Sequence, residues 1–310
     1  MSDEKCTVEE GGCLLAEADV PITALAVREG AVYWATQLGE LHRRDAAGKT
    51  SKLATSFYAG GLMVTSTAVY ATDPAGASAN RVVSVPIDGG EPVTVVPAIE
   101  GFVFGSGIVG DDSDVFWVGP ADGGVTVYGR IATATGVHAE SFHPGQVASI
   151  GFDGTTIYGA RSPGVPQIIG ISRDGAEVET IASLDFDVLA VTADETSIYA
   201  TGKEAVVKIA KSGGQSEVLV TGQTFGTGYA FGDAMASGLR ARGGYVYWVT
   251  VENRIERRGG AVERLGAGES AVTRLLRVEG EVVAIELTDE FVYIALTTEI
   301  RKIRRPEAAP

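Results

Sequence analysis

Short apolar segments recur along the chain, and each is followed by a polar turn and then by a β-branched residue next to an aromatic one. Seven copies of this unit occur: Val32-Tyr33-Trp34, Val69-Tyr70-Ala71, Val115-Phe116-Trp117, Ile157-Tyr158-Gly159, Ile198-Tyr199-Ala200, Val246-Tyr247-Trp248 and Val292-Tyr293-Ile294. They start 37 to 48 residues apart, and the mean spacing of about 43 is the length of one four-stranded propeller blade. The pattern predicts strands rather than solenoid helices.

Each copy has the same internal order: an inner apolar strand, a polar turn, the aromatic strand, a third strand, a glycine-containing turn and a last strand. In the fifth copy the four strands are expected near residues 189–191, 198–201, 206–209 and 218–220. We therefore predict an all-β fold, a seven-bladed β-propeller of four-stranded blades. Residues 1–310 would form one domain.

The last copy is short of one strand. Residues 283–287, 291–296 and 299–304 supply three strands, and a tail follows at 306–310. The segment 13–18, just before the first inner strand, has the pattern of an outermost strand. We predict that residues 1–18 form an N-terminal hairpin and a strand that completes the last blade, which would close the ring and remove two open sheet edges.

Cys6 and Cys13 are the two cysteines of the chain, and the turn-like segment 9–12 lies between them. This spacing predicts a disulfide bond that pins the closing strand, with free thiols as the alternative. Disulfides persist in oxidising compartments. No nearby His or Cys supplies the further ligands that a zinc site would need.

The segments Val32-Tyr33-Trp34-Ala35-Thr36 and Val246-Tyr247-Trp248-Val249-Thr250, with Gly-Gly turns after the third strands, give residues 14–305 a resemblance to a known group. The chain resembles bacterial propellers built from YWTD-like and NHL-like repeats, of the exported lipoprotein type. The resemblance implies an extracytoplasmic protein, periplasmic, outer-surface or secreted, whose export signal is not in this chain. No copy carries a full Tyr-Trp-Thr-Asp, so the ligands of receptor-type domains are not implied. Such repeats occur in binding proteins and in enzymes, and the fold does not settle the function.

The charge balance narrows the range of partners. Forty acidic residues against 25 basic ones give a net charge of −15, which opposes binding to nucleic acid and to anionic membranes. No apolar run is long enough for a transmembrane segment. We expect a monomer whose partner is a small molecule, a glycan or a protein.

The loops that enter the inner strands and those that leave the second strands share one face of a propeller, and here they differ greatly in length. The longest spans 221–238, and long loops in compact domains are often functional. Aromatic walls with carboxylates suit a small polar or cationic ligand. The candidate ligand-binding residues are Phe102, Phe104, His143, Gln146, Asp185, Asp187, Phe225, Tyr229, Phe231 and Asp233. The alternative is that the aromatic residues only plug the channel or pack on a neighbouring blade.

Acidic clusters raise the question of metal binding. The cluster at 111–114 falls on the turn between first and second strands, where Asp is favoured for turn geometry, and the Gly and Glu of a calcium loop are missing. Asp185, Asp187, Asp233 and Glu281 could form part of an axial ring of carboxylates, as in propeller lactonases. Asparagine, which those enzymes also use, occurs only at Asn80 and Asn253.

Catalytic signatures are otherwise lacking. The three histidines, His42, His138 and His143, lie outside the last two copies, where propeller lyases place theirs, and no Gly-x-Ser-x-Gly elbow occurs. The leading hypothesis is a non-catalytic exported propeller that binds a ligand at the channel mouth on the long-loop face. The alternative is a metal-dependent hydrolase, lactonase or lyase that uses axial carboxylates. No catalytic residue and no cofactor is assigned, and a divalent cation such as calcium stays open as a ligand.

Overall fold

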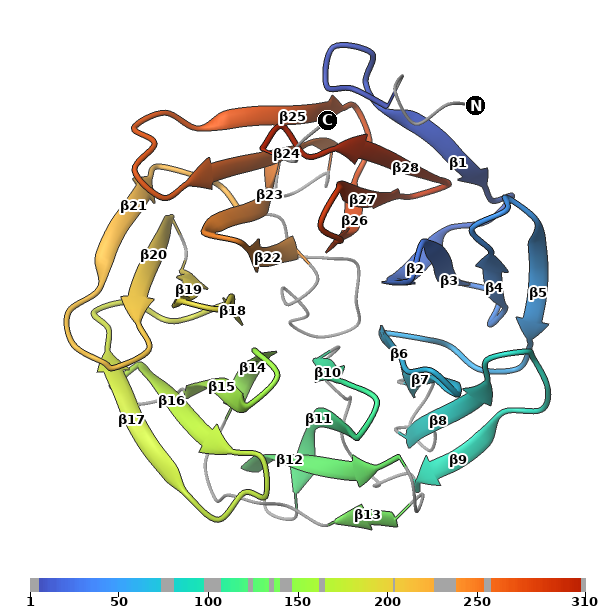
Figure 1. Ribbon diagram of the computed structural model, residues 1–310, viewed down its shortest axis with the longest axis horizontal. Coiled ribbons are helices and arrows are strands. Elements are labelled where there is room, and N and C mark those ends of the chain that lie inside the picture. Colours follow the sequence, from blue (N-terminus) through green and yellow to red (C-terminus); the bar gives the residue numbers. More distant parts are fainter. Residues whose placement is uncertain are drawn as a thin grey trace.

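The computed structural model describes residues 6–73, 81–97, 107–121, 125–133, 137–139, 147–161, 165–202, 204–225, 238–253 and 258–307. Within these ranges the chain forms seven antiparallel four-stranded sheets around a central axis (Figure 1). The predicted all-β, seven-bladed propeller is confirmed. None of the described segments forms a helix of the length and apolarity that crossing a bilayer requires.

The blades follow one another in chain order. Blade 1 holds β2 (Ile22–Arg28), β3 (Ala31–Thr36), β4 (Leu41–Arg44) and β5 (Thr50–Ala54), and blade 2 holds β6 (Gly61–Val64), β7 (Ala68–Asp73), β8 (Arg81–Pro86) and β9 (Val93–Val96). Blade 3 holds β10 (Ile108–Gly110), β11 (Asp114–Ala121), β12 (Val125–Ala132) and β13 (Val137–Ala139), and blade 4 holds β14 (Val147–Phe152), β15 (Thr156–Arg161), β16 (Gln167–Ser172) and β17 (Val178–Ser183). Blade 5 holds β18 (Ala190–Ala193), β19 (Ser197–Thr201), β20 (Ala205–Ala210) and β21 (Glu217–Thr221), and blade 6 holds β22 (Leu239–Arg242), β23 (Tyr245–Asn253), β24 (Arg258–Gly266) and β25 (Thr273–Val278). Blade 7 holds β26 (Val282–Leu287), β27 (Phe291–Leu296), β28 (Glu299–Arg304) and β1 (Cys13–Glu17).

The second strand of each blade contributes buried side chains to the core on both of its sides. Successive side chains of a strand point to opposite faces, and in a propeller both faces are covered by neighbouring blades. In blade 1, Tyr33 packs with Leu62 and Val69 of blade 2, whereas Trp34 packs with Val283 and other residues of blade 7. The recurring β-branched–aromatic unit is therefore buried on both sides, which explains why it marks every repeat.

The ring closes through β1, as the missing strand of the last copy predicts. This strand pairs antiparallel with β28, with Cys13 opposite Lys302 and Glu17 opposite Glu299. A disulfide joins Cys6 to Cys13, as predicted, and the carbonyl oxygen of Cys6 accepts a hydrogen bond of 2.6 Å from the backbone N–H of Arg304. The seventh sheet thus combines strands from both ends of the propeller (Figure 1).

We expect removal of residues 1–18 to destabilise every blade and not only the last one. The change removes the β1–β28 pairing together with the disulfide, and the midpoint of thermal unfolding should fall by about 10 °C or more. Circular dichroism melts of the full chain and of the shortened chain measure the effect. A chain that lacks residues 308–310 is the control, and a shortened chain that melts like the full one would refute this role of β1.

One glycine sets how closely two blades approach. A Cβ at Gly151, on the inner strand of blade 4, would lie 2.8 Å from the Cα of Thr192 and 3.0 Å from the carbonyl oxygen of Val191, both on the inner strand of blade 5. Real side-chain atoms do not approach a backbone so closely. The two inner strands can therefore pack only with glycine at this position.

Gly151→Ala should accordingly push blades 4 and 5 apart and lower the free energy of unfolding by about 1–3 kcal/mol, the usual cost of overpacking. Gly280→Ala is the matched control, because a Cβ there meets no atom within 4 Å. Urea denaturation of both variants gives the comparison. Equal stability of the two would contradict the close-approach argument.

Candidate functional site

The two faces of the propeller differ in their connections. Turns between first and second strands, such as 111–114, 153–156 and 194–197, lie on one face, which we call the turn face. Loops that enter first strands or leave second strands lie on the opposite face, the long-loop face. The sequence analysis assigns its candidate ligand-binding residues to the long-loop face.

The structure describes three of those ten candidates. Phe102, Phe104, His143, Gln146, Tyr229, Phe231 and Asp233 lie outside the described residues. Asp185 and Asp187 are both exposed, on the segment that enters β18. Phe186 between them packs into the core of blades 4 and 5 and over Gly202, where a Cβ would come within 2.2 Å of the phenyl ring. The alternation turns both carboxylates toward solvent on the long-loop face.

Phe225 has a different environment. It is 3% exposed, forms an isolated bridge with Thr250, and belongs to a core cluster that contains Tyr199 of blade 5 and Trp248 of blade 6. Its ring therefore packs between blades, which is the alternative stated for aromatic residues of this face. Direct contact of the ten candidates with a ligand stays a prediction.

The central channel widens into a cavity of about 430 Å³ near the turn face, lined by the inner strands of all seven blades. Strand register defines one ring of this wall, because each inner strand places one residue opposite the aromatic residue of its second strand. The ring consists of Ala26, Met63, Val109, Gly151, Thr192, Arg240 and Glu286. We call these residues the middle ring.

The middle ring is small or apolar in four blades, carries Thr192 in blade 5, and is charged in blades 6 and 7. Arg240 and Glu286 form a two-point ion pair, with Nη2 to Oε1 at 2.5 Å and Nε to Oε2 at 3.2 Å. Their side chains keep 27% and 21% of their surface exposed. The sequence analysis did not single out these two residues. Alignment of the seven copies at the position before each polar turn would have shown the two charges among small and apolar residues.

The carboxylates of the turn face support the turns, as the sequence analysis proposed for this cluster type. Asp153 accepts hydrogen bonds from the backbone N–H groups of Thr155 and Thr156 and from the hydroxyl of Tyr158. It also pairs with Lys211 of blade 5 at 2.5 Å. Asp194 repeats the arrangement with its own turn and accepts an N–H from Gly244 of blade 6. Each carboxylate joins its blade to the next.

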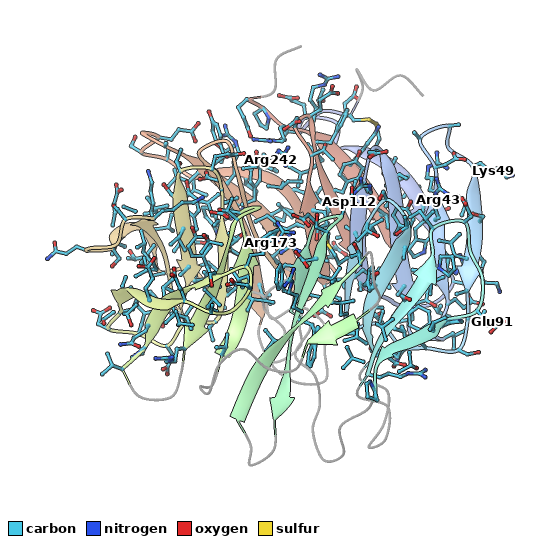
Figure 2. The ribbon with its side chains drawn as sticks, turned by 60° about the horizontal axis from the view of Figure 1, so that its bottom comes forward. Arg43, Lys49, Glu91, Asp112, Arg173 and Arg242 are labelled. Carbon is cyan, nitrogen blue, oxygen red and sulfur yellow. A yellow bond between two sulfur atoms is a disulfide. The ribbon has the colours of Figure 1, made fainter. Side chains whose placement is uncertain are left out.

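Arginines continue these contacts around the turn face. Arg173 of blade 4 pairs with Asp111 at 2.5 Å and with Asp114 at 2.6 Å, both in blade 3. Asp112 pairs with Arg28 of blade 1 and accepts the backbone N–H of Ser66 in blade 2. Figure 2 shows Asp112, Arg173 and Arg242 near the middle of the molecule, whereas Lys49 and Glu91 lie at its rim.

Blades 6 and 7 are joined by two further arginines. Arg242 pairs with Asp289 at 2.6 Å. Arg305, which is 5% exposed, donates to the hydroxyl of Tyr247 and to the carbonyl oxygens of Thr288 and Arg242. The guanidinium of Arg305 is thus held by groups from both blades, as a buried cation requires.

These contacts shift proton affinities. Burial alone would raise the pKa of Asp153, but the hydrogen bonds from Lys211, Thr156 and Thr155 outweigh it and hold the pKa well below its usual range. The pKa of Asp194 is lowered in the same way, against the effect of burial, by N–H donors of its own turn and of Gly244. Both carboxylates are ionised in the folded protein at neutral pH.

His42 and the possible metal ligands among the described residues do not form a further candidate site. His42 stacks on Trp34, with ring centroids 5.3 Å apart, and its Nε2 lies 3.1 Å from Glu40, which is a packing role. Among the residues that the structure describes, no three His, Cys, Asp or Glu side chains gather closely enough to hold a metal ion.

No protein-family model and no curated protein matches the sequence. Solved structures share the fold at low identity. The designed protein Ika8 matches with a TM-score of 0.61 at 13% identity, over 94% of this chain and 100% of that chain. BamB from Moraxella catarrhalis matches with 0.57 at 14%, over 93% of this chain and 85% of that one. PorZ, a surface component of the type IX secretion system of Porphyromonas gingivalis, matches with 0.60 at 12%, over 96% of this chain and 39% of that one. These likenesses show the propeller fold.

Asp153→Asn should make the protein less sensitive to acid. Because the folded-state pKa of Asp153 lies below its unfolded value, this carboxylate contributes stability that is present above about pH 4 and is lost as the pH falls. At pH 7 the variant should be less stable than the wild type by about 1–3 kcal/mol of unfolding free energy, because Lys211 is left without its partner. Between pH 7 and pH 3 the variant should then lose less unfolding free energy than the wild type does.

Urea denaturation at a series of pH values measures this difference. Asp88→Asn is the control, because Asp88 is exposed and lies 3.9 Å from Arg43, and this variant should keep the acid sensitivity of the wild type. If Asp153→Asn loses as much stability on acidification as the wild type does, the turn-face contact has no such effect.

Proposed function

We propose that this protein is a non-catalytic, extracytoplasmic binding or scaffold propeller that takes its partner at the channel mouth on the long-loop face. The observation that carries the proposal is that the two faces of the propeller differ in their contacts and in their connections. On the turn face, Asp111, Asp112, Asp153 and Asp194 are engaged in contacts between blades. The connections that differ most in length lie on the other face, and loops of this kind carry function on rigid scaffolds.

The long-loop face also presents charge. Asp185 and Asp187 are exposed there, next to each other on one short segment. The sequence adds aromatic residues and two further carboxylates, Glu100 and Asp233, in the segments 98–106 and 226–237. Carboxylates beside aromatic rings suit a small polar or cationic molecule or a glycan. A protein that binds the same face is the alternative partner.

Two observations support an extracytoplasmic location. The disulfide between Cys6 and Cys13 belongs to a class of bond that persists in oxidising compartments. Among the propellers of similar fold, PorZ is described as a bacterial surface component. The resemblance to exported lipoproteins with YWTD-like or NHL-like repeats agrees with this location.

A loop replacement tests the proposal. Residues 226–237 would be exchanged for a short Gly-Ser linker, and Phe225 would be kept because it is buried. A thermal-shift screen with mono- and disaccharides, calcium and other divalent cations is run on both proteins, since a ligand of the native state raises the melting midpoint. We expect at least one probe to raise the midpoint of the wild type by 2 °C or more, about the shift given by 1 kcal/mol of binding.

The variant should melt within a few degrees of the wild type in the absence of probes and lose the response to them. Asp185→Asn with Asp187→Asn is a second variant on the same face and should weaken the response to cations. A response that survives the loop replacement places the ligand elsewhere. If none of the probes shifts the wild type, the small-ligand form of the proposal is wrong.

A further inference from the structure

The cavity at the turn face contains a charged pair whose place in the ring is unusual. In the middle ring, blades 1 to 4 have Ala26, Met63, Val109 and Gly151. Blades 6 and 7 instead place Arg240 and Glu286 at the equivalent positions, and both side chains reach the cavity. At the level of the middle ring, one side of the cavity is therefore charged and the facing side is uncharged.

Blades 6 and 7 have contacts at the turn face besides the Arg240–Glu286 pair. Arg242 with Asp289, and Arg305 with Tyr247 and Thr288, already connect blades 6 and 7 at the turn face. Partly burying two charges costs solvation free energy that their mutual attraction repays only in part. Five other blades have uncharged residues at this level, so the charged pair is specific to blades 6 and 7.

The volume and walls of the cavity match a ligand site. Its volume of about 430 Å³ is in the range of small-molecule pockets, and its lining places apolar side chains such as Met63 and Val109 beside charged ones. Nη1 of Arg240 donates to the carbonyl oxygen of Leu239 at 2.9 Å, which fixes the guanidinium against the wall. Both ions of the pair keep part of their surface open to the cavity.

We propose that this cavity binds a small zwitterion of the α-amino-acid type with an apolar side chain. The ligand carboxylate lies beside Arg240 and its ammonium beside Glu286, so that four charges alternate in sign. The apolar side chain packs against Met63 and Val109 across the channel. Asp111, Asp153 and Arg242 also line the cavity, but Arg173, Lys211 and Asp289 pair with them. The charges offered to the ligand are therefore those of Arg240 and Glu286.

This site is separate from the proposed function, because it lies at the other end of the channel from the long-loop face. The loop variant that lacks residues 226–237 should therefore bind the amino acid as the wild type does. The two proposals can fail independently.

The test is isothermal titration calorimetry of the full chain with L-leucine and L-phenylalanine. N-acetyl-leucine lacks the ammonium group and leucine methyl ester lacks the carboxylate, and each should bind at least tenfold more weakly than leucine, as expected for the loss of a charge-assisted contact. Glu286→Gln should weaken binding of leucine at least tenfold. Met63→Trp should abolish it by filling the cavity, and Val109→Phe narrows the cavity from a different blade.

Arg43→Gln is the control, because Arg43 lies outside the cavity, and it should bind leucine like the wild type. Circular dichroism melts establish that each variant is folded. The proposal is overturned if neither amino acid binds at millimolar concentration, or if binding survives in both Met63→Trp and Val109→Phe. Methyl ester that binds as tightly as leucine would show a site for simple amines and would remove Arg240 from recognition.

Discussion

The pairing of β1 with β28 is the interaction on which the ring depends. A propeller has no covalent closure, and here the outermost strand of blade 7 comes from residues that precede blade 1 in the chain. Without β1, the last sheet would have three strands and an open edge. The bond between Cys6 and Cys13 and the contact from Arg304 to Cys6 hold β1 in register. We infer that the contacts between blades depend on this pairing of β1 with β28.

Closure of the ring also explains the ion pairs between blades on the turn face. Once the blades are held in a ring, their turns approach one another on the turn face, and Lys211, Arg173 and Arg305 each reach from one blade to an acceptor in the preceding one. On that face Asp111, Asp153 and Arg242 are held in ion pairs between blades. The connections of the long-loop face differ in length along the sequence, which is why the proposed binding function is assigned to that face. The Arg240–Glu286 pair interrupts the repeat inside the channel.

The repeat pattern of the sequence was sufficient to predict the propeller, the seven blades and the closing strand, because burial on both faces imposes the same residues on every copy. The disulfide followed from the position of Cys6 and Cys13 beside that strand. Contacts such as Lys211 with Asp153 could not be read from the sequence, because they join residues 58 positions apart at a spacing that changes from blade to blade. The sequence also could not show that Phe225, a candidate for ligand contact, forms a bridge with Thr250 and is buried between blades. Its contact with a ligand stays a prediction.

Hydrogen exchange of the oxidised and the reduced protein, followed by mass spectrometry, tests most directly whether closure supports the whole ring. Reduction of the bond between Cys6 and Cys13 makes opening of β1 easier. If the seven blades unfold cooperatively, the free energy of opening of amides in β14–β16, on blade 4, should fall by as much as that of amides in β28. Protection that drops in β1 and β28 while β14–β16 keep their full protection would contradict this account.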